Sequence, residues 1–494
     1  MVDRVFPPIK TDSNRTMELQ EKSFRHQADD VALSITKQLF AKHDKNMVFS
    51  PLSLLAVLSI IASGSAGRTL DQLLSFLRFD SVDHLTTFFS QVVSAVFSDD
   101  SHLSFANGTW VDKSVSLSHS FKQLVATHYK AALASTDFRK GDQVCREVNS
   151  WVEKETKGLI KNLLPPGAVD KTTGLIFANA LHFKGVWKHK FDVSITREDD
   201  FHLLNGTSVK VPYMRSNGNK QIRFISTFGG FKVLRLFYEQ GRDDKRQISM
   251  YIFLPNEKDG LPALIDKLAS QPGFLKHNLL LLDERKVQAR RLKIPKFKIS
   301  FEFEASQVLK ELGVVLPFSQ RAGFTKMVEV NSPSVGSIFH KASIEVNEEE
   351  TVAVAATAAR MVLGGAGLCP HIDFVADHPF LFLVREDITG TILFVGQVLN
   401  PLDGAGTPVK EDLGKRKRFQ GNAKKLKKMS SDFESKKTGK EKDEDESAGH
   451  EDDKPVVPPK RKRSSKVKGE EEDDLFLRKP GNDWRKLCLA RFFS

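Results

Sequence analysis

Apolar and polar residues alternate strictly in one part of the chain. The alternating segment is 297–303, Phe-Lys-Ile-Ser-Phe-Glu-Phe. Because successive side chains of a strand point to opposite faces, this alternation predicts a half-buried β-strand. The segments 248–254 and 392–395 are more continuously apolar, which is typical of central strands.

Helical spacing dominates the first third of the chain, and strand signals follow after about residue 175. Asp29 and Asp30 precede an apolar stripe beginning at Val31, which predicts a helix capped by these acids. Apolar residues at helical spacing predict a second helix around 144–152. A short helix over 305–312 ends before a glycine, as a C-cap requires. Helices followed by strands indicate an α+β domain with a large antiparallel or mixed sheet.

Composition changes sharply after residue 402. The 494 residues are 40% hydrophobic and 9% aromatic, enough to bury a sizeable core. Between Asp403 and Ser494, blocks of 25 Lys/Arg and 19 Asp/Glu alternate and carry half of the net charge of +12. Such a segment cannot offset its ordering entropy, so we predict a disordered tail.

Cysteine usage and hydropathy narrow the class of protein. Cys145, Cys369 and Cys488 lie far apart, which argues against a disulfide framework and a cysteine-based zinc site. The N-terminal residues lack the apolar run of a secretory signal. The most apolar early stretch, 52–62, is shorter than the about 20 residues of a transmembrane helix. We therefore expect no membrane contact.

Signatures of catalysis and cofactor binding are missing from the sequence. It has no G-x-S-x-G, H-E-x-x-H or phosphate-loop pattern, and its 14 His residues show no metal-ligand spacing. The segment 364–367 is glycine-rich but lacks the lysine and following helix of a phosphate site. We expect no enzymatic activity, no cofactor and no metal.

The segment 345–370 is the least typical of a folded domain. Acidic residues lead into a run of Ala, Thr and Val, followed by glycines. An exposed Ala-rich helix or a surface linker fits this composition. Read as a strand, residues 351, 353, 355, 357 and 359 form one face of small side chains, which could slot between existing strands without steric conflict.

The chain resembles the serpin family, and within it the plant serpins. The similar segments follow one another along residues 20–402, which makes the resemblance more specific than a single motif. They are 46–53 (NMVFSPLS), 63–69 (SGSAGRT), 149–152 with 156–158, 177–187 (FANALHFKGVW), 340–350 (HKASIEVNEEE), 373–382 (DFVADHPFLF) and 400–402.

The resemblance implies an α+β serpin fold with three β-sheets, about nine helices and an exposed reactive-centre loop. It places a flexible N-terminus at 1–20, the serpin domain at 21–402, the loop at about 348–372 and the disordered tail at 403–494. It also implies a suicide bait. A protease cleaves the loop and stays attached as an acyl-enzyme while the loop inserts into the main sheet. The serpin itself catalyses nothing, and we expect a monomer.

Aligning the loop with the family places the scissile bond between Gly364 and Gly365. That alignment gives 17 residues from Glu348 to the cut, the length that the family uses. Arg360 and Leu363 are alternative bait positions. The hinge residues are Glu348, Glu349, Glu350, Thr351, Ala353, Ala355 and Thr357.

Further positions match residues around the place where a serpin sheet opens. Ser50, Ser53, Asn179 and His340 match a polar cluster, with ordinary hydrogen bonding as the alternative. We expect Thr351 to turn inward beside this cluster. Trp187 matches the tryptophan where insertion begins, with core packing as the alternative. Lys296 matches the ion-pair partner of Glu348; an exposed pair contributes about 0–1 kcal/mol.

Two departures from the family pattern keep a second function open. Glu350 stands where the hinge usually has glycine, and its side chain restricts the backbone. Gly364 cannot fill a specificity pocket, whereas plant relatives often place arginine there. The first hypothesis is an inhibitor of serine or papain-like cysteine proteases. The second is a non-inhibitory serpin-fold protein that binds partners, in the nucleus, through its tail.

The tail carries candidate nuclear-import signals. Basic clusters at 415–418 and 460–463 lie on a predicted disordered carrier, and Lys460, Arg461, Lys462 and Arg463 could bind an import receptor. The alternative is a tail of mixed charge that carries no targeting signal. Interleaved acids and the lack of an aromatic series argue against nucleic-acid binding. We expect a nuclear or cytoplasmic protein; an extracellular location, as in some relatives, stays open.

Overall fold

A computed structural model describes the folded part of the chain. The described residues are 27–96, 103–216, 222–240, 246–275, 278–279, 286–289, 291–330, 333–348 and 372–403. Residues 27–40 are helical. The helices that follow are α2 (Pro51–Ser63), α3 (Gly67–Leu77), α4 (Val82–Val96), α5 (His119–His128), α6 (Gly141–Glu155), α7 (Leu261–Ser270) and α9 (Ser306–Glu311). Short 3-10 turns are η1 (Phe138–Lys140), η2 (Val193–Ile195) and η3 (Leu316–Phe318).

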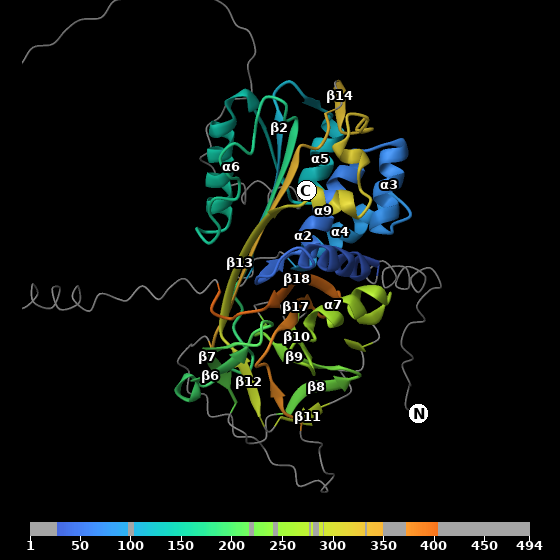
Figure 1. Ribbon diagram of the computed structural model, residues 1–494. Coiled ribbons are helices and arrows are strands. Elements are labelled where there is room, and N and C mark those ends of the chain that lie inside the picture. Colours follow the sequence, from blue (N-terminus) through green and yellow to red (C-terminus); the bar gives the residue numbers. More distant parts are fainter. Residues whose placement is uncertain are drawn as a thin grey trace, which may run out of the picture. The chain divides into compact units, whose positions relative to one another are not determined.

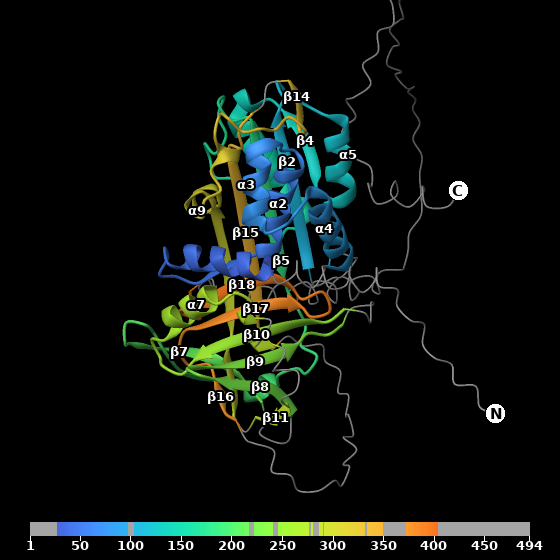
Figure 2. The ribbon, with the colours of Figure 1, turned by 90° about the vertical axis from the view of Figure 1, so that its right-hand side faces the viewer.

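A five-stranded mixed sheet separates the helices into two groups. Its order is β13 (Phe297–Glu304), β15 (Ser337–Val346), β5 (Leu175–Phe183), β2 (Leu103–Asp112) and β4 (Ala132–Thr136). The β15–β5 and β2–β4 pairs are parallel, and the other two are antiparallel. Figure 1 shows α6 on one face of this sheet and α2 on the other, and Figure 2 looks onto the face that α2 covers.

The remaining strands form three further sheets among the described residues. The seven-stranded sheet runs β1 (Met47–Phe49), β18 (Thr391–Val398), β17 (Phe380–Glu386), β10 (Ile248–Pro255), β9 (Phe231–Phe237), β8 (Ile222–Phe228) and β11 (Lys286–Gln288). The four-stranded sheet runs β16 (Phe374–Val375), β12 (Leu292–Pro295), β7 (Ser208–Arg215) and β6 (Arg197–His202). The pair is β14 (Val328–Val330) with β3 (Ser116–Leu117).

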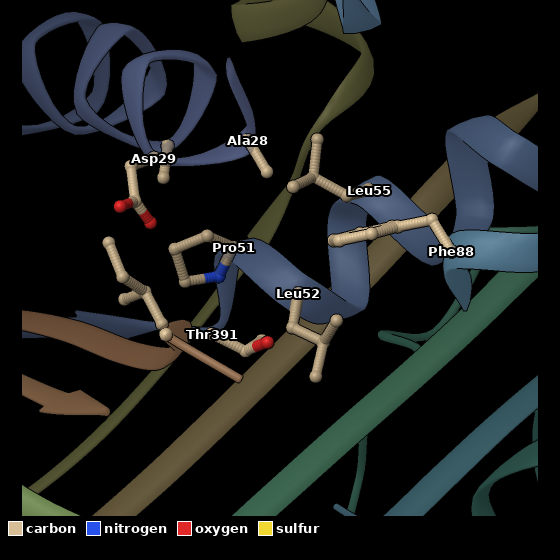
Figure 3. Close-up of a pocket in the computed structure, with 10 residues that line it drawn as sticks. Ala28, Asp29, Pro51, Leu52, Leu55, Phe88 and Thr391 are labelled. Atoms are coloured by element: carbon tan, nitrogen blue, oxygen red, sulfur yellow. The ribbon is translucent and has the colours of Figure 1, made fainter. Parts of the chain in front are cut away.

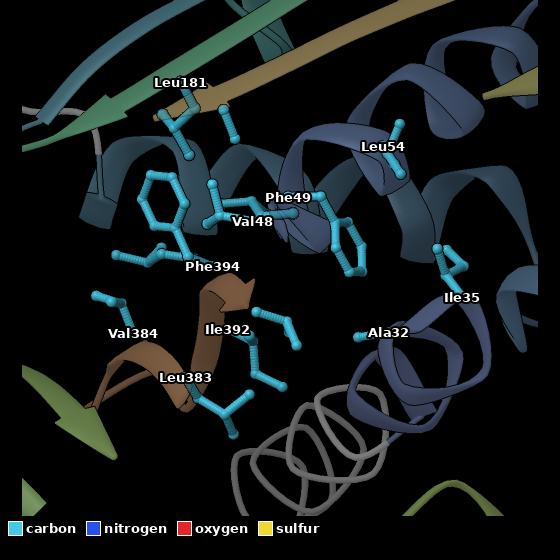
Figure 4. Packing of buried hydrophobic residues seen from close by; sticks show 14 of the residues in the cluster. Ala32, Ile35, Val48, Phe49, Leu54, Leu181, Leu383, Val384, Ile392 and Phe394 are labelled. Atoms are coloured by element: carbon cyan, nitrogen blue, oxygen red, sulfur yellow. The ribbon is translucent and has the colours of Figure 1, made fainter. Parts of the chain in front are cut away.

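The main core lies around α2. Every residue of this helix is buried, as expected for a helix that is apolar on all sides. Its start is set locally, because the Ser50 hydroxyl accepts from the Ser53 amide and Pro51 occupies the first turn. Figure 4 shows Leu54 of α2 near Phe49 of β1, with Leu181 of β5 and Phe394 of β18 in the same cluster.

A smaller core lies under α6. Its members are mostly apolar residues of α6, β2 and β5, and Trp110 packs edge-on against Trp151 at 4.9 Å between ring centroids. The helix predicted around 144–152 is therefore confirmed. The side chains of Ala178 and Ala180 on β5 belong to this core, so α6 covers the middle of the sheet with small residues beneath it.

Several local predictions are confirmed and two need correction. The alternating segment is β13, the apolar segments are the central strand β10 and part of β18, and α9 ends before Gly313, whose φ is 95°. However, the helix that we expected to start after Asp29 is already helical at residue 27, so the two acids lie inside it. The first third of the chain, which we expected to be mainly helical, also contains the strand β2. Its buried Asn107 and the adjacent Gly108 interrupt the alternation of apolar and polar residues that would have predicted a strand.

Candidate functional site: the seam between β5 and β15

The parallel pair of β15 with β5 lies in the interior of the five-stranded sheet. We call it the seam; it pairs Ser337 to Ile344 with Ile176 to Phe183 in register. The chain leaves β15 at Val346 and reappears at residue 372, just before β16 in another sheet. A strand that turned back from β15 would run antiparallel to β15 and to β5. It would replace one parallel ladder by two antiparallel ones, which pair slightly better per residue.

A neutral histidine closes the seam on the face toward α2. His340 Nε2 accepts from the Ser50 backbone N–H at 3.0 Å, and its Nδ1 lies 3.1 Å from Asn179 Oδ1. The first contact requires an unprotonated Nε2, so Nδ1 carries the proton and donates it to the amide oxygen. Full burial lowers the pKa of His340 to about 3. The predicted cluster of Ser50, Ser53, Asn179 and His340 is therefore together in space, with Ser53 one turn along α2.

Polar groups in this cluster are left without partners. The Ser53 hydroxyl and the Asn179 amide nitrogen are buried and form no hydrogen bond. Asn107 pairs with Asn179 across β2 and β5, is 3% exposed, and both polar atoms of its side chain are unpaired. Sequence reasoning missed Asn107, although a lone amide at an inward position of a strand was a signal. A buried polar group that stays unpaired costs about 1–3 kcal/mol, so this cluster stabilises the closed seam less than a fully bonded one would.

A tryptophan holds the end of the seam at which β15 finishes. Trp187 Nε1 donates to the Asn347 carbonyl at 2.8 Å, directly beyond the end of β15. The indole stacks on Tyr238, with ring centroids 4.3 Å apart and planes inclined by 13°. Trp187 is therefore a core residue that also contacts the chain just beyond β15; a role in insertion stays a prediction. The role of Tyr238 was not predicted.

A buried carboxylate lies beside this tryptophan contact. Glu348 accepts from Lys296 Nζ and from Thr196 Oγ1, each at 2.6 Å, and is only 4% exposed. Burial raises the pKa of Glu348, but the hydrogen bonds from Lys296 and Thr196 outweigh it and leave the pKa below its ordinary value. The ion pair is thus half-buried. The contribution to stability that we expected for an exposed pair therefore underestimates that of this pair. Thr196 was missed by the sequence analysis.

A lysine ties the opposite face of the seam to the covering layer. Lys341 Nζ donates to the Lys161 carbonyl at 2.9 Å and pairs with Glu302 on β13 at 2.5 Å. Lys161 lies after α6, in the segment that packs against β2 and β5. Adjacent residues of β15 therefore hold the two faces, His340 inward and Lys341 outward. Separating β15 from β5 breaks or displaces both contacts.

A small pocket lies away from the seam, beside the first helix. Figure 3 shows Asp29 at its edge with Pro51, Leu52 and Phe88. Its volume of about 10 Å³ has room for one water at most. Burial raises the pKa of Asp29 to about 7, although Arg385 at 3.9 Å lowers it. Across the described ranges, no group of three His, Cys, Asp or Glu could hold a metal ion, and no helix is long and apolar enough to cross a membrane.

Much of the predicted bait lies outside the described residues. These positions are Glu349, Glu350, Thr351, Ala353, Ala355, Thr357, Arg360, Leu363, Gly364, Gly365, and Lys460 to Arg463 in the tail. The expected position of Thr351 beside the polar cluster therefore stays a prediction, because residue 351 is not among the described residues.

This arrangement is the one expected of a serpin. The sheet has a parallel seam that is closed on both faces, and a long segment of the chain separates β15 from the next strand. A family model described as Serpin (serine protease inhibitor) matches residues 26–401. The chain belongs to the serpin family. At the level of the family, this membership supports an inhibitor of proteases and not a catalyst.

Plant serpins are among its similar relatives. Serpin-ZX of Arabidopsis thaliana is 52% identical over 389 residues, which cover 76% of this chain and 97% of that relative. Serpin-ZXA of Oryza sativa subsp. japonica is 50% identical over 72% of this chain and 91% of its own length. The solved structure of Arabidopsis AtSerpin1 in its native stressed conformation has a TM-score of 0.71 and 48% identity. It covers 77% of this chain and 99% of that one.

Proposed function

We propose that this serpin inhibits a serine or papain-like cysteine protease as a suicide bait. The observation that carries the proposal is the seam, a parallel pair with unpaired buried polar groups whose strand β15 leads directly into the predicted bait. The protease nucleophile attacks the Gly364 carbonyl carbon, the bond to Gly365 breaks, and the new amine of Gly365 takes a proton and leaves. An acyl bond then joins the serpin to the protease while the cleaved loop enters the seam.

The sequence of the loop suits the space at the centre of the seam. A strand that turned back within a few residues of Val346 would bring a residue between 355 and 361 opposite His340. Directly opposed residues of an antiparallel pair share a face, so that residue would point toward α2. Residues 355, 357 and 359 are Ala, Thr and Ala, which are small enough to pass the crowded polar cluster.

The choice of bait residue decides whether cleavage ends in a trapped protease. A cut after Arg360 leaves 13 residues from Glu348, whereas a cut after Gly364 leaves 17. The shorter segment carries an attached protease less far down a sheet whose strand β15 is ten residues long. We therefore expect trypsin to cut after Arg360 and be released, and proteases that accept small residues to be trapped.

A comparison of two protease classes tests this proposal. The intact protein is incubated with an elastase-like protease and with trypsin, and adducts that survive denaturing gel electrophoresis are mapped by mass spectrometry. We expect an adduct at Gly364 with the first enzyme and free cleaved serpin with trypsin. The cleaved protein should also melt at a much higher temperature than the intact one. An unchanged melting temperature after cleavage between residues 360 and 365 would show that the loop does not insert.

We also propose that the tail directs this serpin to the nucleus. The support is the basic cluster Lys460 to Arg463, which import receptors could bind. A fluorescent fusion of the full chain should concentrate in nuclei, and removal of residues 403–494 should abolish that concentration. A matched variant with the four basic residues changed to Ser tests the cluster alone. Identical distributions of the three proteins would contradict the proposal.

A further inference from the structure

A second histidine lies on the seam, on the face opposite His340. His182 of β5 pairs with Ser343 of β15 across the seam and with Ser104 of β2 on its other side. It is 5% exposed, and neither ring nitrogen has a hydrogen-bond partner. Both ring nitrogens of His340, by contrast, are bonded. An imidazole buried in this way pays for its lost hydration without any compensating hydrogen bond.

The charged groups near His182 do not offer it a free counter-ion. Glu345 of β15 is the carboxylate nearest along the seam, but it already pairs with Lys298 of β13 at 3.0 Å. It also accepts from Asn347 Nδ2 at 3.0 Å. Lys184, the residue that follows β5, adds another positive charge. Lys341, two residues before Ser343 on β15, is paired with Glu302, and β2 has no titratable side chain between residues 103 and 111.

These surroundings keep the imidazole neutral. Burial lowers the pKa of His182 first; Glu345 raises it, and Lys298 and Lys184 lower it further. An imidazolium in this place would meet two lysines and a carboxylate that is already engaged. Opening the seam moves β15, with Glu345 and Lys298, away from β5 and lets water reach the ring. The open state can therefore take up a proton that the closed state refuses.

We propose that His182 makes the opening of the seam near the C-terminal end of β15 acid-sensitive, so that loop insertion accelerates when the pH falls below about 6. This inference rests on the proposed insertion mechanism and adds its regulation. A histidine in water has a pKa of about 6.5. If only the open state binds the proton, lowering the pH from 7.5 to 5.5 multiplies the open population about tenfold.

The test measures insertion without a protease. A synthetic peptide copying residues 351–363 is added to the full-length protein at pH 7.5 and 5.5, and its rate of incorporation is followed by fluorescence. We expect incorporation of the peptide to be about tenfold faster at pH 5.5 for the unchanged protein. His182→Gln and His182→Phe should reduce this ratio below about twofold. His119→Gln, which changes an exposed histidine on α5, should leave it tenfold.

The outcomes separate this inference from the proposed function. Incorporation at equal rates at both pH values would overturn the role of His182 and leave insertion standing. An undiminished tenfold ratio in both His182 variants would assign the effect to another group, such as His340, and would also overturn it. Failure of the peptide to incorporate at either pH would contradict insertion itself. Circular-dichroism melting at pH 7.5 establishes that each variant is folded. Because His182 is replaced in two ways, the test still works if one of the two variants does not fold.

Discussion

Replacing Lys296 by methionine should destabilise the closed serpin through the buried Glu348. The methionine keeps most of the apolar stem but removes the ammonium group 2.6 Å from the carboxylate. Removing one partner of a fully buried pair costs about 3–5 kcal/mol, and an exposed pair contributes about 0–1 kcal/mol. Glu348 is 4% exposed but Lys296 is 35% exposed, so solvent screens the pair on one side. We expect a loss of about 1–3 kcal/mol, with Thr196 retaining part of the carboxylate's stabilisation.

The pH dependence of this effect has a definite sign. The folded-state pKa of Glu348 lies below its ordinary value of 4.5, since hydrogen bonds from Lys296 and Thr196 outweigh burial. A depressed carboxylate pKa contributes stability that is present above the unfolded pKa and is lost as the pH falls through the folded pKa. The difference between the variant and the unchanged protein should therefore be largest near pH 7 and shrink toward pH 4.

A double-mutant cycle isolates the pair from other effects of the substitution. Thermal unfolding of Lys296→Met, Glu348→Gln and the double variant gives the coupling energy, and the single variants should melt about 1–4 °C lower. Lys298 and Glu345 provide a matched control, because their side chains are 54% and 27% exposed and should couple by less than about 1 kcal/mol. A coupling at Lys296–Glu348 no larger than this control would refute the burial argument.

Three further substitutions test other parts of the structure. Lys341→Met removes the contact with the Lys161 carbonyl, which must give way as the seam opens, and should raise the fraction of stable adduct over cleaved serpin in gel assays. Glu350→Gly should also raise the yield of adduct with proteases that cut near Gly364, because glycine relaxes the backbone and removes a charge. Burial raises the pKa of Asp29 to about 7, so its stabilisation is present below its unfolded pKa and lost as the pH rises through 7. The melting temperature of Asp29→Asn, relative to the unchanged protein, should therefore increase from pH 5 to pH 8.

Local elements were predictable because one or two physical rules determine them. β13 alternates because one face packs on the core and the other meets solvent, and its residues show that alternation in their burial. α9 ends before Gly313 because glycine adopts the left-handed conformation at little cost. The resemblance to serpins placed Ser50, Asn179 and His340 in one cluster, and the described residues bring them into contact.

Residues that act through distant partners were not predictable from their own segments. Thr196 and Tyr238 contact Glu348 and Trp187 across 152 residues and 51 residues of chain, and nothing in the local pattern marks either one. Asn107 was not singled out in the sequence, yet it lies buried beside Asn179. The half-burial of the Glu348 ion pair was also missed, since burial depends on what packs over a side chain.

The sequence by itself determined the class of fold, the strands and helices with strong periodicity, and the resemblance to the family; the position of the bait stays a prediction. Only the tertiary structure decided that β15 pairs in parallel with β5, and which side chains close that seam. The physical reason is that alternation specifies which side of a strand is buried but is the same for every possible neighbour. Register, partner strand and the fate of each buried polar group follow from packing between segments that are far apart in the chain.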